Sequence, residues 1–294
     1  MVIEKKRLPR SKPCSGLLVP AAHESVKAHF GEVPEYVYAS PRSLRGINIY
    51  LPTGQRLNVE FEAQNVWRKD FDYWLLQRSE AEISDLTAFS WCEEVDRTIS
   101  VTCERQQRTV QFTAKYLIGA DGGNSKVVKC LTPSLYEGVP WFVAYQEYFT
   151  RKIDLDEASF HIFLNPDWGF YSWVNRKDEN IIIGTTVPKE NKVLPYYKCF
   201  LEYLGQNYGF RPTEEVRKEG CLVNLMAATN NFFFGRENIL VAGEAAGFLN
   251  MFGEGISSAL RTGNLAGEAI VESIKGRTSA HAVYQKLVAK ERAR

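Results

Sequence analysis

Four closely spaced glycines near the end of the chain could bring backbone amides against a ligand. The segment from Leu240 to Gly263 reads LVAGEAAGFLNMFGEGISSALRTG, and we expect a helix from about Ile256. Glycine has no Cβ, so another molecule can approach its backbone closely. The first turn of a helix adds unpaired N–H groups and the positive end of the helix dipole. This segment therefore predicts a site for a phosphate or another polarised oxygen.

A second short glycine motif follows another apolar stretch. Residues 116–118 are typical of a buried strand, and residues 119–125, GADGGNS, follow it. Asp121 would then lie at the carboxyl end of the strand, where ligands bind in open α/β sheets. Its carboxylate could accept a hydrogen bond from a ribose or ribityl hydroxyl, or it could cap the following helix. Taken alone, so short a motif leaves both interpretations open.

Composition excludes several classes of function. The 294 residues are 45% hydrophobic and 24% charged, with a formal net charge of +1. This balance argues against a nucleic-acid partner, which usually requires a basic stripe. Six scattered cysteines without a CxxC pair favour the reduced thiols of a cytoplasmic protein, and four unclustered histidines predict no metal site. No apolar run reaches the length that a membrane span requires.

Strand and helix patterns at both ends of the chain enclose a strand-rich middle. A hairpin is expected around residues 46–61 and strands within 97–118, 140–187 and 239–242, with helices near 21–30, 69–81, 193–207, 256–274 and 279–292. This order predicts an α/β nucleotide-binding domain with an inserted antiparallel β-sheet domain. We expect residues 1–45, 97–135 and 215–294 to form the nucleotide-binding domain. Residues 46–96 and 136–214 would form the mainly β-rich substrate-binding part, with the helix near 69–81 as a connection.

Together, the two glycine motifs resemble those of the flavoprotein monooxygenase and geranylgeranyl reductase superfamily. Its members carry an internal GADG-x-x-S segment and a distal G-D-A-A-G segment around FAD. The resemblance implies a Rossmann-like FAD/NAD(P)-binding domain, FAD as the cofactor and oxidoreductase activity. It places Asp121, with Gly119 and Gly122, near the ribityl and pyrophosphate groups. The positions implied for the ribityl hydroxyl and the pyrimidine end of the flavin are Gly243, Glu244, Ala246 and Gly247, followed by Gly253, Gly255 and Ile256.

Three positions depart from the superfamily pattern. Glu244 stands where an Asp is usual, and Val128 where many relatives have Arg. Residues 250–252 replace an Asp/Ser-Pro-x-x segment and are one residue shorter. We therefore expect the wall beside the flavin to differ from that of relatives.

Two further segments resemble the cofactor side of geranylgeranyl reductases. Residues 12–16, KPCSG, are similar to a Lys-x-Cys-Gly-Gly loop that approaches the flavin, which assigns Lys12 to cofactor binding and Cys14 to proton donation. Arg10 and Lys12 could make the surroundings of this thiol electropositive. Arg68 begins an R-x-x-F-D pattern whose Arg often contacts the FAD phosphates. The alternatives are that Cys14 is a small buried hydrophobe and that Arg68 pairs with a nearby acid.

A substrate-side motif is present in altered form. Tyr171 and Trp173 fit the P-x-x-Y-x-W-x-F pattern of geranylgeranyl reductases, but Trp168 replaces Pro and Asn175 replaces Phe. In relatives these aromatic residues line a lipid cavity over the flavin. Packing within the sheet core is the alternative role for Tyr171 and Trp173.

The expected first unit of an FAD-binding Rossmann domain is missing from the sequence. There is no G-x-G-x-x-G, and residues 1–4 read as the second strand, with Glu4 as the ribose-binding acid. We therefore expect a Rossmann-like domain that is incomplete at its N-terminus and binds FAD weakly. A gene fragment, or a degenerate homologue without catalytic activity, is one open interpretation.

These observations lead to one expected function and one alternative enzyme activity. We expect an FAD-dependent oxidoreductase that reduces carbon–carbon double bonds of a prenyl or other apolar substrate. Its electron donor would be NAD(P)H, a ferredoxin or a quinol. The alternative is a flavin-dependent aromatic monooxygenase or halogenase. The basic run from Lys5 to Lys12 leaves a peripheral membrane contact open for this otherwise cytoplasmic protein.

Overall fold

A computed structural model describes residues 1–211, 217–276 and 278–291, which form two compact units. Unit 1 comprises Met1–Arg10, Leu76–Pro140 and Asn224–Arg294, and unit 2 comprises Ser11–Leu75 and Trp141–Val223. Among the described residues, no helix has the length and apolar character needed to cross a membrane.

This division differs from the expected domain boundaries in two main places. Residues 11–45 belong to unit 2, because β3 (Tyr38–Tyr50) pairs with β4 (Arg56–Val66) and β11 (Phe160–Phe163). Residues 76–96 belong to unit 1, where β6 (Thr87–Val95) pairs with β7 (Thr98–Arg105). Pairing with the distant strand β11 sets the first of these boundaries, and the β6–β7 hairpin sets the second.

Unit 2 is built on one eight-stranded sheet. Its strand order is β14-β10-β13-β12-β11-β3-β4-β2, and the strands not yet given are β2 (Leu17–Leu18), β10 (Trp141–Phe149), β12 (Tyr171–Lys177), β13 (Asn180–Pro188) and β14 (Arg217–Asn224). The sheet is mixed rather than antiparallel as expected, because β3 and β11 run parallel. Parallel neighbours require a long crossover, and more than a hundred residues separate these two strands.

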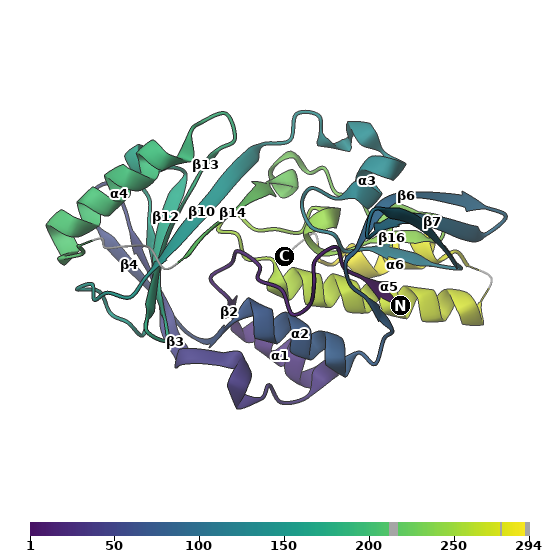
Figure 1. Cartoon of the computed structure of the whole chain (residues 1–294), viewed down its shortest axis with the longest axis horizontal. Helices are drawn as coiled ribbons and strands as arrows, with labels where there is room; N and C mark the ends of the chain where they lie inside the picture. The colour runs from purple at the N-terminus through teal and green to yellow at the C-terminus, as the bar shows by residue number, and fades with distance from the viewer. Residues whose placement is uncertain (212–216, 277, 292–294) are drawn as a thin grey trace. The chain divides into compact units, whose positions relative to one another are not determined.

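Helix α4 (Val193–Tyr208) covers one face of this sheet, as Figure 1 shows beside β12 and β13. Val174 of β12 packs there against Phe200 and Leu204. Side chains alternate along a strand, so Tyr171, Trp173, Asn175 and Lys177 occupy the opposite face. We call these four residues the β12 row. Helices α1 (Pro20–Phe30) and α2 (Arg68–Arg78) also contact each other, with the Phe30 and Trp74 rings 6.5 Å apart.

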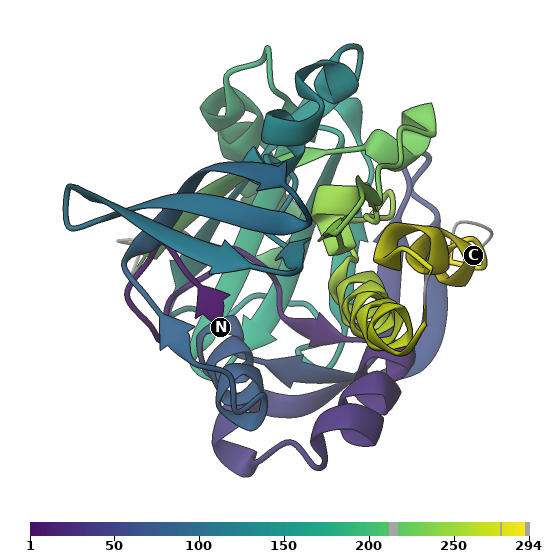
Figure 2. The same cartoon turned by 90° about the vertical axis from the view of Figure 1, so that its right-hand side faces the viewer.

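Unit 1 combines short strands with three helices. Its smallest sheet pairs β1 (Val2–Ile3) with β5 (Ile83–Ser84). A second sheet has the strand order β6-β7-β8, and a third has the order β15-β16-β9. The bounds of these strands are Arg108–Ala114 for β8, Leu117–Gly119 for β9, Gly235–Arg236 for β15 and Ile239–Val241 for β16. Helices α5 (Ile256–Lys275) and α6 (Ala280–Val288) pack together, as the yellow helices of Figure 2 show. Helix α3 (Lys126–Leu131) was expected only under the interpretation that Asp121 caps a following helix. The expected end of the last helix, residue 292, lies outside the described residues.

Five short 3₁₀ helices complete the described secondary structure. They are η1 (Glu35–Val37), η2 (Pro133–Tyr136), η3 (Pro166–Trp168), η4 (Met226–Thr229) and η5 (Gly243–Ala246). The five predicted helices are present, most of them within a few residues of their expected bounds.

Gly184 is a test of how tightly the sheet of unit 2 is packed. A Cβ at this position would lie 2.2 Å from Cζ2 of Trp173. We expect Gly184→Ala to lower the free energy of unfolding by roughly 1–3 kcal/mol, because the ring must shift. Gly263→Ala is the control, since nothing lies within 4 Å of its Cβ position and alanine favours the helix. Urea titrations that find equal effects for the two variants would contradict this packing.

Candidate functional site

Strand pairing brings the two glycine motifs of unit 1 together. Strands β9 and β16 are parallel, with Gly119 opposite Val241. The amide of Ala242 donates to the carbonyl of Gly119 at 3.0 Å. Both strands end at the same edge of the sheet, so the turns that follow them are neighbours. This is the edge at which open α/β sheets bind their ligands.

Glu244 links the two turns. A Cβ on Gly123 would lie 2.6 Å from Oε1 of Glu244, so glycine is needed for the carboxylate to approach. Asn224 holds the same turn by donating its side-chain amide to the carbonyl of Gly123. The first turn thus presents backbone, rather than side chains, toward Glu244.

The second turn is held by its backbone conformation and by a side chain of α5. Gly243 has a φ of +63° and donates its amide to Oγ1 of Thr262 at 2.8 Å. Ala246 is buried in the core of unit 1, and Gly247 ends the turn with a φ of +97°. Two of the expected glycines therefore occupy conformations that most residues disfavour.

The start of α5 already has a carboxylate beside it. Gly255 precedes the helix and Ile256 begins it, without a side-chain cap from Gly255. Oε1 of Glu254 accepts from the amide of Ser257 at 2.8 Å, and Gly253 reaches a φ of +79° just before. A second negative group at this helix end would be repelled by Glu254. The end therefore suits a neutral carbonyl oxygen better than a phosphate.

Asp121 caps helix α3. Its Oδ2 accepts from the amides of Lys126 at 2.7 Å and Val127 at 3.3 Å, and Ser125 caps the same helix through Val128. The capping interpretation of this residue is thus correct. A contact between Asp121 or Gly122 and a cofactor stays a prediction.

Glu4 already has partners within unit 1. Its two carboxylate oxygens accept from the amide of Lys6 at 2.9 Å and from Nε of Arg10 at 2.7 Å. The strand before it, β1, pairs in parallel with β5. A ribose hydroxyl at Glu4 would compete with these bonds.

Cys14 of unit 2 lies next to two buried cations. It lies beside Arg68, which makes a bidentate ion pair with Asp72 at 2.7 and 3.0 Å. Burial alone would lower the pKa of Arg68, but Asp72 and Cys14 raise it above its usual value. The amide of Gly16 donates to the Cys14 sulfur at 3.3 Å. Arg68 therefore both pairs with an acid, as one interpretation held, and contacts the thiol.

Lys177 is the second cation and was missed from the sequence. It is fully buried, donates to the carbonyl of Val66 and lies 5.1 Å from the centre of the Trp67 ring. Burial lowers its pKa to about 7, although the nearby Cys14 and Asp178 oppose this shift. Side chains two residues apart on a strand share a face, and this alternation could have placed Lys177 on the same face as Trp173 from the sequence.

The two cations that we expected beside Cys14 have other surroundings. Lys12 is exposed, and Arg10 is paired with Glu4. Arg68 and Lys177 are the buried cations beside the thiol. Binding of a cofactor by Lys12 or Arg68 stays a prediction.

Tyr171 and Trp173 form an aromatic pair in the sheet of unit 2. Their ring centres are 5.8 Å apart, and Trp173 packs against Phe160 and Ile162. Burial raises the pKa of Tyr171 to about 12, so its hydroxyl stays protonated at neutral pH. Both residues belong to the sheet core. Contact with a substrate on the same face stays a prediction.

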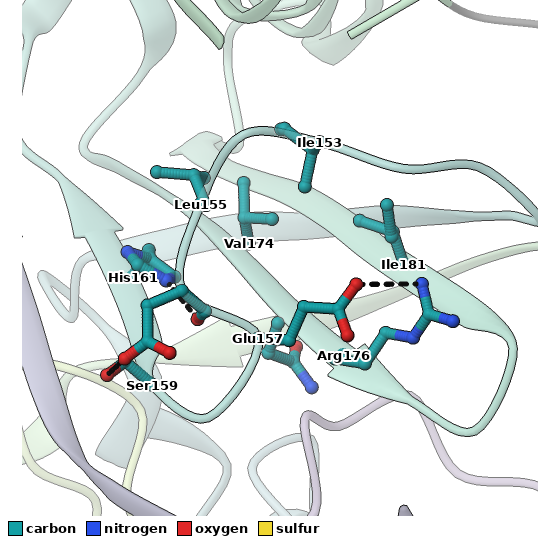
Figure 3. A pocket seen from close by; sticks show the side chains of 10 residues that line it. Ile153, Leu155, Glu157, Ser159, His161, Val174, Arg176 and Ile181 are labelled. Carbon is teal, nitrogen blue, oxygen red and sulfur yellow. Dashed lines mark hydrogen bonds and ion pairs between the residues drawn. The ribbon is translucent and has the colours of Figure 1, made fainter. Parts of the chain in front are cut away.

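A small cavity in unit 2 is too small for a cofactor or substrate. It measures about 10 Å³ and lies beside His161, Val174 and Ile181 (Figure 3). His161 is held by the carbonyl of Asp156 at 2.9 Å, and burial lowers its pKa. This volume admits about one water molecule. Within the described ranges, no three His, Cys, Asp or Glu side chains could together hold a metal ion.

Comparison with known proteins identifies relatives over most of the chain. A family model described as FAD binding domain matches residues 55–219. Protein CbrA of Escherichia coli (strain K12) is 30% identical over 254 residues, which are 85% of this chain and 70% of the relative. Protein CbrA of Shigella sonnei is 29% identical over 259 residues, 87% of this chain and 72% of the relative.

Solved structures share the fold at low sequence identity. A geranylgeranyl bacteriochlorophyll reductase-like protein from Thermoplasma acidophilum superposes with a TM-score of 0.80 at 17% identity, over 99% of this chain and 76% of that one. The myxobacterial chondrochloren halogenase CndH gives 0.75 at 16% identity, over 97% and 71%. The p-nitrophenol 4-monooxygenase of Pseudomonas putida gives 0.68 at 13% identity, over 97% and 75%. The expected fold class is confirmed.

Removal of the Asp121 cap should destabilise unit 1. We expect Asp121→Ala to lower the free energy of unfolding by about 1 kcal/mol, because two amides at the start of α3 lose their acceptor. Asp121→Asn keeps an acceptor oxygen and should lose less. Denaturant unfolding of both variants checks this, and an equal loss would show that the carboxylate charge, not the cap, is what matters.

The buried amine of Lys177 should make stability depend on pH. Its pKa in the folded protein, about 7, lies below that in the unfolded chain. The unfolded state therefore binds more protons between these values, and stability should rise with pH above about 7, by at most about 1.4 kcal/mol per pH unit. We expect Lys177→Met to lose this rise in urea titrations at pH 7 and pH 9. Exposed Lys198→Met is the control and should keep the rise; a wild-type-like profile for Lys177→Met would refute the assignment.

Proposed function

Because this chain belongs to the FAD-binding domain family, we propose that it reduces a carbon–carbon double bond of a prenyl or other apolar substrate. The family confirms the superfamily expected from the glycine motifs, FAD as the cofactor and the class of FAD-dependent oxidoreductase. The double-bond reduction is our proposal within that class.

The residues of unit 1 fit FAD. The turn at Gly122 and Gly123 brings backbone close to Glu244, whose carboxylate can accept from a ribityl hydroxyl. The start of α5 beside Glu254 suits a neutral carbonyl, such as those of the pyrimidine end of a flavin. When bound and reduced, FAD supplies a hydride equivalent. The chain itself must bind the substrate, exclude water and supply a proton.

The surroundings of Cys14 are the observation that most favours a reductase. Addition of a hydride to one carbon of a double bond requires a proton on the other. Cys14 can donate that proton, and Lys177, with a pKa of about 7, can return one to the sulfur. The positive charge of Arg68 lies beside the thiol, and the amide of Gly16 donates to its sulfur.

The apolar residues around the β12 row would enclose the substrate. Trp173 packs with Leu44, Phe160 and Ile162, and Tyr171 and Leu17 pack against this cluster. Enclosure of this kind excludes water from the reacting carbons. The reductase-like fold neighbour from Thermoplasma acidophilum supports the same proposal.

Oxygen-dependent chemistry is the second candidate function. The chondrochloren halogenase and the p-nitrophenol monooxygenase share the fold of this chain. Oxygen consumption that matches the formation of a hydroxylated or halogenated aromatic product would favour this candidate. Double-bond reduction under anaerobic conditions would favour the reductase.

Cys14→Ala tests the proposed proton donor. We expect anaerobic reduction of geranylgeranyl diphosphate, with dithionite as reductant, to slow by roughly 10²-fold or more, because a positioned proton donor is lost. The FAD content, measured by absorbance, should not change. Cys199→Ala is the control, since Cys199 is an exposed cysteine on α4. Unchanged turnover in Cys14→Ala would remove Cys14 from the mechanism.

A further inference from the structure

Buried polar atoms without partners lie on the sheet face of unit 2 that carries the β12 row. Asn175 is 1% exposed, and neither its side-chain nitrogen nor its oxygen has a hydrogen-bond partner among the described residues. Nε1 of Trp173 also has no hydrogen-bond partner among the described residues, and the Trp173 residue is 7% exposed. An unsatisfied buried polar group is costly, so such groups are normally paired.

Neighbouring polar residues show that this sheet can satisfy buried amides. Gln146 of β10 lies opposite Gly184 of β13. Its side-chain amide donates to the hydroxyl of Tyr148 at 2.8 Å and to the carboxylate of Glu219 at 3.3 Å. Asn65 donates to the carbonyls of Pro41 and Arg176, both at 3.0 Å. Asn65 keeps an unpartnered oxygen, but of these three amides Asn175 alone has neither its nitrogen nor its oxygen paired.

Trp173 and Asn175 are close enough to serve one ligand group. They are two residues apart on β12, so their side chains leave the same face about 7 Å apart. Trp173 offers one N–H donor, and the Asn175 amide offers both donors and an acceptor. The next residue of the row is Lys177, whose amine lies near the loop of Cys14 and Gly16. Apolar side chains, Phe160 and Ile162 among them, surround Trp173.

We propose that Trp173 and Asn175 bind the carboxamide-like end of an otherwise apolar substrate. Such a group has an oxygen that accepts from the two side chains and an N–H or O–H that donates to Asn175. This inference rests on the proposed function, because it takes this face of unit 2 as the substrate side. It narrows the substrate from any prenyl hydrocarbon to an apolar molecule with a carbonyl end.

Two compounds with the same carbon skeleton test this inference. Calorimetric titration of the oxidised holoprotein with geranic acid amide and with 2,6-dimethylocta-2,6-diene separates the polar contact from apolar burial. We expect the amide to bind roughly tenfold tighter or more, the gain typical of a satisfied buried hydrogen bond. Equal binding of the two compounds would overturn the inference.

Asn175→Leu removes the amide with little change in volume. We expect it to abolish the preference for geranic acid amide and to leave the ligand-free protein as stable as before or more stable, because an unsatisfied group is gone. The cavity of Figure 3 lies on the Val174 side of β12, the face opposite to the Asn175 amide. A less stable Asn175→Leu that keeps the preference would assign the amide to the stability of the ligand-free protein and refute the proposal.

Two further variants complete the test. Trp173→Phe keeps an aromatic ring without the N–H, and it should also weaken amide binding. Asn207→Leu, on the exposed side of α4, should change nothing.

Binding is measured without reductant, so the two proposals can fail separately. Amide preference without double-bond reduction contradicts the proposed function alone, and reduction without amide preference contradicts this inference alone.

Discussion

The parallel pairing of β9 with β16 is the constraint on which the candidate cofactor site depends. These strands are separated by about 120 residues of sequence, yet Gly119 lies opposite Val241. Each strand is only three residues long, so a shift in register would separate the two turns. The present register brings Glu244 against Gly123 at a distance that only glycine permits. A backbone-lined edge follows, of the kind that binds the polar parts of a cofactor.

A different constraint, the alternation of side chains, organises unit 2. One face of the large sheet packs against α4 through residues such as Val174 and Phe200. The other face carries Trp173, Asn175 and Lys177, together with apolar neighbours. Burial has opposite consequences for these polar groups. It lowers the pKa of Lys177 to about 7, where the amine can exchange protons, and it leaves the Asn175 amide in need of a partner.

Much of the fold could be predicted because its signals are local. The hairpin between β3 and β4, the helix at α4 and the start of α5 at Ile256 follow from turn residues and apolar periodicity. The parallel pairing of β3 with β11 and the membership of β6 in unit 1 could not be predicted in this way. The first depends on hydrogen bonds between segments far apart in the chain, and the second on which unit the β6–β7 hairpin joins. Periodicity carries no information about either.

The sequence by itself determined the family, the cofactor and the two glycine motifs. A ligand can approach the backbone closely only where residues such as glycine stand at fixed positions, and the sequence shows those positions directly. Only the tertiary structure decided what surrounds each side chain. Asp121 and Glu4, expected to bind a cofactor, also bind the chain's own amides and Arg10. Cys14 acquires its cations from Arg68 and Lys177, which are 54 and 163 residues away. Charge and burial at a site are set by neighbours in space, and folding alone brings those neighbours together.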